Sequence, residues 1–217
     1  MCAASPDRMV REPRTPRQCA RVQGILDAAR YAFANKPFDR VLMDDVASRA
    51  GVGKGTIYRY FPDKESLYFA VICTGIEALE VQIRSSVKTR GNITTIVRRL
   101  IDTLVSFFHH NRLFFRLMNI EDSKVGGEDR PNRRRWHRER NRLIAAIAEV
   151  LEHGQKSKAL QVAYARTDAQ ILMGMVRSVL RHREEQLSVD EMKDEIARVF
   201  LNGVCSGTSR RPCGHGS

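Results

Sequence analysis

The chain has 217 residues, of which 42% are hydrophobic and 29% charged, so it has enough apolar side chains for a core, and global disorder is excluded. Its formal net charge of +12 favours a polyanionic partner, and nucleic acid is the commonest one for a soluble chain. Taken alone, the charge is explained about equally well by a basic but otherwise ordinary surface.

Several sequence features predict a cytoplasmic protein without a membrane partner. No run of 18 or more apolar residues occurs, and the N-terminus, with arginines among prolines, lacks the apolar stretch of a secretory signal. The five cysteines are odd in number and widely spaced, which fits neither a disulfide framework nor a CxxC metal site. We therefore expect a reducing compartment, no metal and no cofactor.

Helical periodicity runs through nearly the whole chain, and strand alternation is not found, so the predicted fold class is all-α with about nine helices. Residues 1–18 are rich in Pro and Arg and are expected to form a disordered basic arm, and residues 206–217 a flexible tail. The first helix is predicted at about 20–35, before Pro37, and two short helices near 43–50 and 54–61.

The later helices are placed by their capping residues and apolar faces. Asp63 and Asn92 are good N-cap residues for the fourth and fifth helices, and a sixth follows near 113–118. A polar break at 122–131 precedes a seventh helix, which we expect to end at Gly154 because glycine is the usual C′ residue. The eighth and ninth helices are centred on 172–179 and 192–200.

The segment from Met43 to Phe61 has the composition of a helix-turn-helix. Acidic residues lie in the first turn of its first helix, where they favour the positive end of the helix dipole. Gly51 falls where the chain must reverse, and glycine adopts a positive φ without steric cost. Val52 can then fill the angle between the two helices.

The second helix of this segment has distinct inward and outward faces. At 100° per residue Ile57 and Phe61 point inward, whereas Gly55 and Arg59 lie opposite them, flanked by Thr56 and Tyr58. The outward face suits a major groove, because Gly55 permits close approach and an arginine can address guanine or phosphate. Lys54 and Lys64 favour phosphates. Each residue alone is more often an ordinary surface or packing residue; their order and spacing carry the prediction.

Residues 51–67, GVGKGTIYRYFPDKESL, resemble the recognition segment of the tetracycline-repressor (TetR) family, and residues 43–47 and the first helix are similar to it too. The resemblance covers about residues 20–70. It implies a homodimer whose two helix-turn-helix heads (19–66) bind a palindromic operator on double-stranded DNA, and a helical domain (67–205) that binds a small-molecule effector and pairs the subunits. Such a repressor would be cytoplasmic and associated with the nucleoid.

The resemblance also assigns roles to single residues. Lys54, Thr56, Tyr58, Arg59 and Lys64 match positions that commonly contact DNA in the family, whereas Tyr60 and Phe61 match positions that pack. The chain departs from the family pattern at Leu42, where Thr or Ser usually caps the second helix, and at Gly53, where Ser is commonest. Both departures put the usual phosphate contacts in question.

Two further sets of residues are predicted sites. The ligand pocket is expected among large apolar residues of the fifth to seventh helices, although ordinary core packing explains them as well: Phe107, Phe108, Phe114, Phe115, Met118 and Trp136. The dimer interface is expected on the last two helices, although intrachain core has the same pattern: Leu172, Met175, Val176, Val179, Ile196, Val199 and Phe200.

Other functional classes are weaker. Residues 53–56 superficially resemble a phosphate-binding loop, but that motif needs glycine at Ser48 and Ser or Thr at Gly55, so an NTPase is disfavoured and no catalytic residue is predicted. The basic run 133–138 is either a second nucleic-acid surface, with Trp136 as a stacking platform, or a solvated helix face, which we favour. An activator, a nonspecific DNA binder, and a small-molecule carrier or enzyme with a vestigial head remain alternatives.

Overall fold

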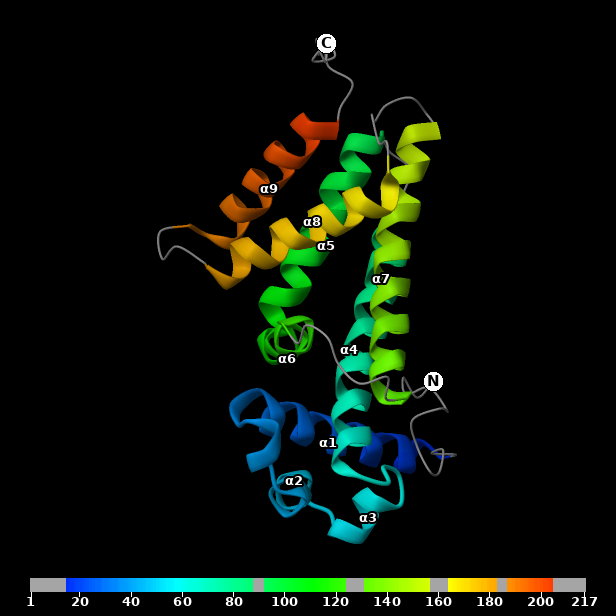
Figure 1. Ribbon diagram of the computed structural model, residues 1–217, viewed down its shortest axis with the longest axis vertical. Helices are drawn as coiled ribbons and strands as arrows, with labels where there is room; N and C mark the ends of the chain where they lie inside the picture. The colour runs from blue at the N-terminus through cyan, green and yellow to red at the C-terminus, as the bar shows by residue number, and fades with distance from the viewer. Residues whose placement is uncertain (1–14, 88–91, 124–130, 157–163, 183–186, 205–217) are drawn as a thin grey trace, which may run out of the picture. The chain divides into compact units, whose positions relative to one another are not determined.

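Helices make up all of the regular structure in the residues that the computed structural model describes, namely 15–87, 92–123, 131–156, 164–182 and 187–204. This confirms the predicted all-α class (Figure 1). The elements are α1 (Pro16–Asn35), the 3₁₀ turn η2 (Phe38–Arg40), α2 (Met43–Ala50), α3 (Lys54–Tyr58), α4 (Lys64–Ser86), α5 (Ile93–His110), α6 (Arg112–Ser123), α7 (Pro131–Lys156), α8 (Ala165–Arg181) and α9 (Val189–Val204).

Local hydrogen bonds explain where several helices begin. The Asp63 carboxylate accepts from the Ser66 amide at 2.6 Å, and the Asn92 side chain accepts from the Thr95 amide at 2.8 Å, which confirms both predicted N-caps. Helix α1 begins at Pro16, about four residues before the predicted start, because Thr15 and Gln18 form a reciprocal capping box. The rest of the expected arm and the tail lie outside the described residues.

Two predicted helix ends were wrong. Helix α7 continues through Gly154 to Lys156, and Gly154 is buried within it. Gly154 is therefore an interior residue of the helix and not its C′ residue, because tertiary context can override a local capping preference. Helix α3 is shorter than expected, because Arg59 already forms its C-cap. Most of the predicted polar break, 124–130, lies outside the described residues.

The chain divides into two compact units. Unit 1 contains residues up to Gln82 and residues 106–143, so it holds α1, α2, α3, most of α4 and α6. In Figure 1 the ribbon of α4 leaves the group formed by α1, α2 and α3. The buried apolar residues of unit 1 include Val22, Ile25, Leu26, Ala29, Phe33, Val46, Ile57, Phe61, Leu67, Ile72, Ile76, Leu79, Phe114 and Leu117.

Helix α4 is long and apolar. By length and composition alone it could cross a membrane, yet 72% of its apolar window is buried within the fold, as in a core helix of a globular protein. Gly75 shows how closely it is packed, because a Cβ atom at this position would overlap the ring of Phe114 on α6. Glycine here permits the close approach of the two helices.

Unit 2 contains residues 83–105 and the residues from Ile144 onward, and so includes most of α5, the second part of α7, α8 and α9. Helices α8 and α9 contact one another and lie side by side in Figure 1. Lys193 of α9 forms an ion pair with Asp102 of α5 at 3.2 Å. The buried apolar residues of unit 2 include Val97, Leu100, Leu104, Ile147, Leu151, Leu172, Val176, Ile196 and Phe200.

Candidate nucleic-acid interface

The turn between α2 and α3 has the geometry that the sequence predicted. Gly51 adopts φ 65°, ψ 33°, in the left-handed region, which glycine enters without penalty. The Gly51 amide donates to the carbonyl of Ser48 at 3.2 Å and the Val52 amide to the carbonyl of Ala47 at 3.0 Å. This pair of bonds is a Schellman motif, which ends α2 and turns the chain into α3.

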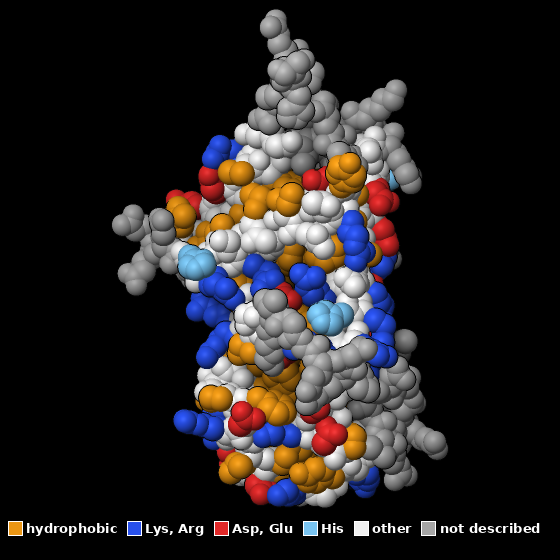
Figure 2. Space-filling model, viewed as in Figure 1, with side chains coloured by type: hydrophobic (Ala, Val, Ile, Leu, Met, Phe, Trp, Pro, Cys, Tyr) orange, Lys and Arg blue, Asp and Glu red, His pale blue; other side chains and the backbone are white. Residues whose placement is uncertain are grey.

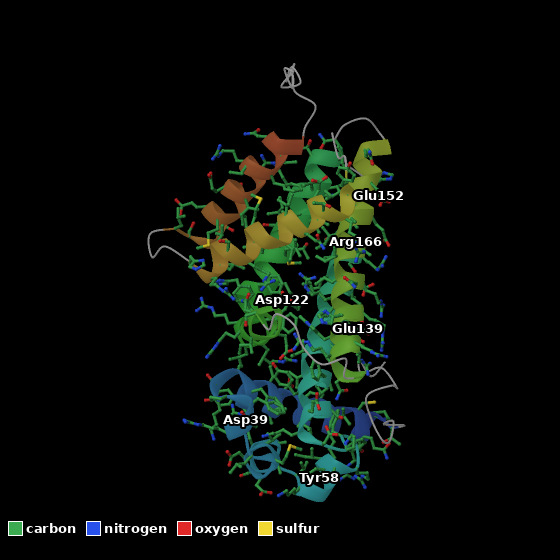
Figure 3. All side chains as sticks on the ribbon, viewed as in Figure 1. Asp39, Tyr58, Asp122, Glu139, Glu152 and Arg166 are labelled. Carbon is green, nitrogen blue, oxygen red and sulfur yellow. The ribbon has the colours of Figure 1, made fainter. Side chains whose placement is uncertain are left out.

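Helix α3 has one buried and one exposed face, as predicted. Ile57 and the following Phe61 are fully buried against the rest of the head. The outward residues Lys54, Gly55, Tyr58 and Arg59 are exposed, and Thr56 is partly exposed. Figure 3 shows Tyr58 on α3. A Cβ atom added to Gly55 would meet nothing within 4 Å, so the backbone is open to an approaching partner.

Lys54, the first residue of α3, is held by an acidic residue of α2. Its ammonium lies 2.9 Å from a carboxylate oxygen of Asp44, and both side chains remain largely exposed. The hydrogen bond and charge of Asp44 raise the pKa of Lys54 above its usual value, so this lysine is cationic at neutral pH. The neighbouring Asp45 forms a similar pair with Lys36 at 2.8 Å.

Arg59 is the exposed cation nearest the end of α3. Its guanidinium carbon lies 5.4 Å from the centroid of the buried Tyr60 ring, which provides an apolar base beneath it. A second cation–π contact, which sequence reasoning missed, places the Arg49 guanidinium 3.6 Å from the centroid of Tyr31. This contact joins α2 to α1, and no sequence motif identifies it because the two residues are on different helices.

Lys64 has a structural role that sequence reasoning missed. Its ammonium donates hydrogen bonds to the backbone carbonyls of Phe38, Asp39 and Val41, at 2.9, 3.3 and 3.2 Å. It also lies 4.6 Å from the centroid of the Phe38 ring. An ammonium group has three N–H donors, and the three carbonyls use them all. Lys64 therefore fixes the turn that precedes α2, and its contact with a DNA phosphate stays a prediction.

At both positions that depart from the expected cap pattern, the helix begins without a side-chain cap. Leu42 is the N-cap residue of α2 and makes no side-chain cap hydrogen bond, and its side chain is exposed. Gly53 is the N-cap residue of α3 and likewise provides no side-chain bond, although its carbonyl accepts from the Thr56 amide at 2.8 Å. The hydroxyl groups with which family members usually cap these helices are thus missing here.

A buried hydrogen bond joins α4 to α6 and was not foreseen. The hydroxyl of Tyr68 on α4 donates to the Glu121 carboxylate at 2.7 Å. Burial and the negative charge of Glu121 raise the pKa of Tyr68 well above its usual value. The Tyr68 ring also makes edge contacts with Phe33 and Phe38. It therefore links α6 to the same turn that Lys64 holds.

The predicted ligand-pocket residues form a packed aromatic cluster in unit 1. The Phe108 ring is in contact with those of Phe107, Phe114 and Phe115, with centroids 5.2–6.2 Å apart. Met118 and Trp136 are also buried. The structure thus brings the four phenylalanines together, three of them buried and Phe115 partly exposed, and their role in ligand binding stays a prediction.

The seven residues predicted at the dimer interface divide into buried and exposed ones, and their role in dimerisation stays a prediction. Leu172, Val176, Ile196 and Phe200 are almost fully buried within unit 2 of the single chain. Helical periodicity identified their shared face correctly, but that face packs inside the subunit. Of the other predicted residues, Val199 is exposed and Met175 and Val179 are partly exposed.

The basic run 133–138 is not a continuous solvated face. Arg134 and Arg138 are exposed, whereas Arg135 and Trp136 are buried. A buried indole cannot stack on a nucleic-acid base, so the stacking-platform interpretation of Trp136 was wrong. Nearby, Arg140 forms an ion pair with Asp122 at 2.9 Å; Figure 3 labels Asp122 on α6. Within the described ranges, no group of three His, Cys, Asp or Glu residues could hold a metal ion.

Comparison with known proteins identifies the family. Residues 25–71 match the model of bacterial regulatory proteins of the tetR family. The transcriptional activator FasR of Mycolicibacterium smegmatis is 31% identical over 109 residues, which span 50% of this chain and 49% of FasR. The match thus extends over about half the length of that relative.

Solved structures share the fold beyond the matched segment. A putative fatty acid metabolism regulator of Clostridium perfringens has a TM-score of 0.72 and 23% identity, covering 83% of this chain and 97% of that one. AibR, in a structure with isovaleryl coenzyme A and operator DNA, has a TM-score of 0.67 and 17% identity, covering 82% and 97%. The family match over residues 25–71 fits the helix-turn-helix geometry of α2 and α3 and identifies this part of the chain as a DNA-binding head of the TetR family of transcriptional regulators.

Proposed function

We propose that the protein is a ligand-responsive, dimeric transcriptional repressor that binds a palindromic operator through α3. The observation that carries this proposal is the exposed face of α3, where Lys54, Gly55, Tyr58 and Arg59 are open to solvent above a buried Ile57. A helix of this kind, presented by a Schellman turn, fits the recognition helix of a helix-turn-helix in the major groove.

The exposed residues divide into two roles. Arg59 and Thr56 contact base edges, because arginine forms paired hydrogen bonds with guanine and a hydroxyl with any base. Lys54 and Tyr58 contact phosphates, which position the head without reading sequence. Gly55 allows the backbone to approach the DNA. Lys64 acts on DNA binding only through the turn that its hydrogen bonds fix.

The dimer surface that we propose is the outer face of α8 and α9. Ile171 and Val199 are 52% and 45% exposed, and Met175 and Val179 are partly exposed. An exposed apolar face on two adjacent helices fits a second copy of the chain, with the helices of both copies forming a bundle. We also expect a dimer because one short recognition helix contacts too few bases to define a specific site.

The effector that we propose is a fatty acyl thioester of coenzyme A. Two structural relatives support this class: the C. perfringens protein is named a putative fatty acid metabolism regulator, and AibR was crystallised with isovaleryl coenzyme A. An acyl chain is apolar and suits the surroundings of Phe108 and Met118. Because these residues are packed, the acyl chain of the effector would enter by moving α6 against α4. This movement favours the arrangement of the heads that has low operator affinity.

Activation is the second candidate for the regulatory outcome, because FasR is named an activator. Transcription in vitro from a promoter carrying the selected site distinguishes repression from activation, because a repressor lowers the transcript yield and an activator raises it. In either case the protein acts in the cytoplasm, where we propose that it associates with the nucleoid.

Selection of bound duplexes from a random DNA pool at physiological salt tests the proposal. We expect a palindromic site whose half-sites are one helical turn or more apart. Substitution Arg59→Ala should then weaken binding to this site by about 1–3 kcal/mol and relax the preference at one position of each half-site. Binding without sequence preference, with a steep dependence on salt, would instead make the protein a nonspecific basic DNA binder.

A further inference from the structure

We propose that Asp44 is a built-in competitor for DNA phosphate at Lys54, and that it weakens binding of the head to every duplex, whatever its sequence. The inference rests on the proposed contact between Lys54 and DNA. It adds a residue that acts against binding, in a head where the other assigned residues favour it.

The geometry places this acidic residue beside the recognition helix. Asp44 is the second residue of α2 and Lys54 the first residue of α3, and an oxygen of the carboxylate lies 2.9 Å from the ammonium nitrogen. A carboxylate and a phosphate offer a lysine the same kind of anionic oxygen acceptor. In the free protein Asp44 therefore occupies the position at Lys54 that a backbone phosphate takes in the complex.

The ion pair is weak enough to be exchanged. The side chains of Lys54 and Asp44 are 49% and 66% exposed, and exposed pairs of this type contribute little to stability. When Lys54 turns to a phosphate, the Asp44 carboxylate remains close to the DNA backbone without its partner. Its negative charge then repels the phosphates, and this repulsion is the same on operator and on random DNA.

The net positive charge of the chain explains why an acidic residue that weakens DNA binding would be useful. With a formal net charge of +12, the chain has a general attraction for any duplex. Figure 2 shows acidic side chains among basic ones on the visible surface of the molecule. An acidic residue at the recognition helix reduces nonspecific occupancy where the protein comes closest to DNA.

The same helix turn provides a matched control. Asp45 follows Asp44 in α2 and pairs with Lys36 at 2.8 Å, and these side chains are 46% and 52% exposed. Lys36 follows the end of α1 and is not part of α3. Neutralising Asp45 removes the same charge, the same kind of ion pair and the same helix-dipole interaction, but leaves Lys54 paired.

The test measures dissociation constants for a random duplex and for the selected operator, over a range of salt, with full-length Asp44→Asn, Asp45→Asn, Lys54→Met and the double variant Asp44→Asn/Lys54→Met. We expect Asp44→Asn to tighten binding to both duplexes about threefold to fivefold near 0.1 M salt, and Asp45→Asn by less than about twofold. In the Lys54→Met background, the gain from Asp44→Asn should become smaller, because the competition for Lys54 is gone and only the direct repulsion between Asp44 and phosphate is left. Thermal melts confirm that each variant folds.

Equal gains from Asp44→Asn and Asp45→Asn would overturn the inference, because the effect would then belong to net charge alone. An undiminished gain in the Lys54→Met background would overturn it as well. Failure of the proposed function is a separate result: wild-type protein would then bind operator and random duplex equally, while the comparison of the two aspartates on random duplex could still be made.

Discussion

In the recognition hairpin of α2 and α3 every residue predicted to face outward is at least partly exposed, whereas in the helix pair of α8 and α9 four of the seven predicted interface residues are buried within the chain. In the hairpin, Gly51 fixes where the chain turns, which in turn fixes which residues of α3 point inward. In the helix pair, Leu172 and Ile196 gave only an apolar stripe. An apolar stripe shows that one face of a helix is buried, but not which element buries it. A turn with defined backbone geometry also fixes which neighbouring helix packs against that face.

The sharpest test of this comparison is in the helix pair, where inner and outer apolar residues are neighbours. Leu172→Ala should lower the free energy of unfolding by about 3 kcal/mol, because it leaves a cavity in the core of unit 2. Ile171→Asp should leave unit 2 folded but shift the protein toward monomer. Denaturant unfolding and sedimentation velocity measure the two effects. A stable Leu172→Ala variant that becomes monomeric would restore the original interface prediction.

In the hairpin, two lysines that the resemblance treats alike should behave differently. Lys64→Met should lower the stability of the head by about 2 kcal/mol, because three backbone carbonyls lose a charged donor. Lys54→Met should leave stability within about 0.5 kcal/mol and weaken binding to all duplexes. Thermal melts and binding titrations of both variants decide the matter. If Lys64→Met melts like the wild type yet binds DNA poorly, Lys64 contacts phosphate after all.

The contact between Tyr68 and Glu121 extends the comparison to a pair that no local pattern predicts. Tyr68→Phe should cost about 1–2 kcal/mol near neutral pH, because the buried carboxylate of Glu121 loses the hydrogen bond that the phenol donates. The pKa of Tyr68 is raised in the folded state, so the unfolded chain loses the phenolic proton first, and this contribution to stability decreases above about pH 10. Unfolding at pH 8 and at pH 10.5 should therefore show a smaller difference between the two proteins at the higher pH.

The smallest expected effect distinguishes an exposed functional glycine from an exposed neutral one. Gly55→Ala and Gly24→Ala each place a methyl group in open space within a helix, so neither should destabilise the fold and each can add up to about 0.5–1 kcal/mol. Only Gly55→Ala should weaken DNA binding, because Gly24 lies within α1, outside the predicted contact surface. Equal DNA affinity for both variants would remove Gly55 from the interface.

Helix positions and the inward face of α3 followed from sequence because they depend on residues close together in the chain, such as the caps Asp63 and Asn92. What could not be predicted depends on partners far along the chain. The donors of Lys64 find carbonyls more than twenty residues away, and Tyr68 finds a carboxylate 53 residues away. For the same reason, periodicity could not distinguish the intrachain packing of Phe200 from packing against a second copy.

The missing side-chain cap at Leu42 has a consequence for how the head opens. A hydroxyl or carboxyl cap contributes about 1 kcal/mol to a helix end, and the first turn of α2 lacks this contribution. Local unfolding begins where the stabilising contacts are fewest. In hydrogen–deuterium exchange, the amides at the start of α2 should therefore exchange before those of the buried part of α4, and Leu42→Thr should slow them selectively.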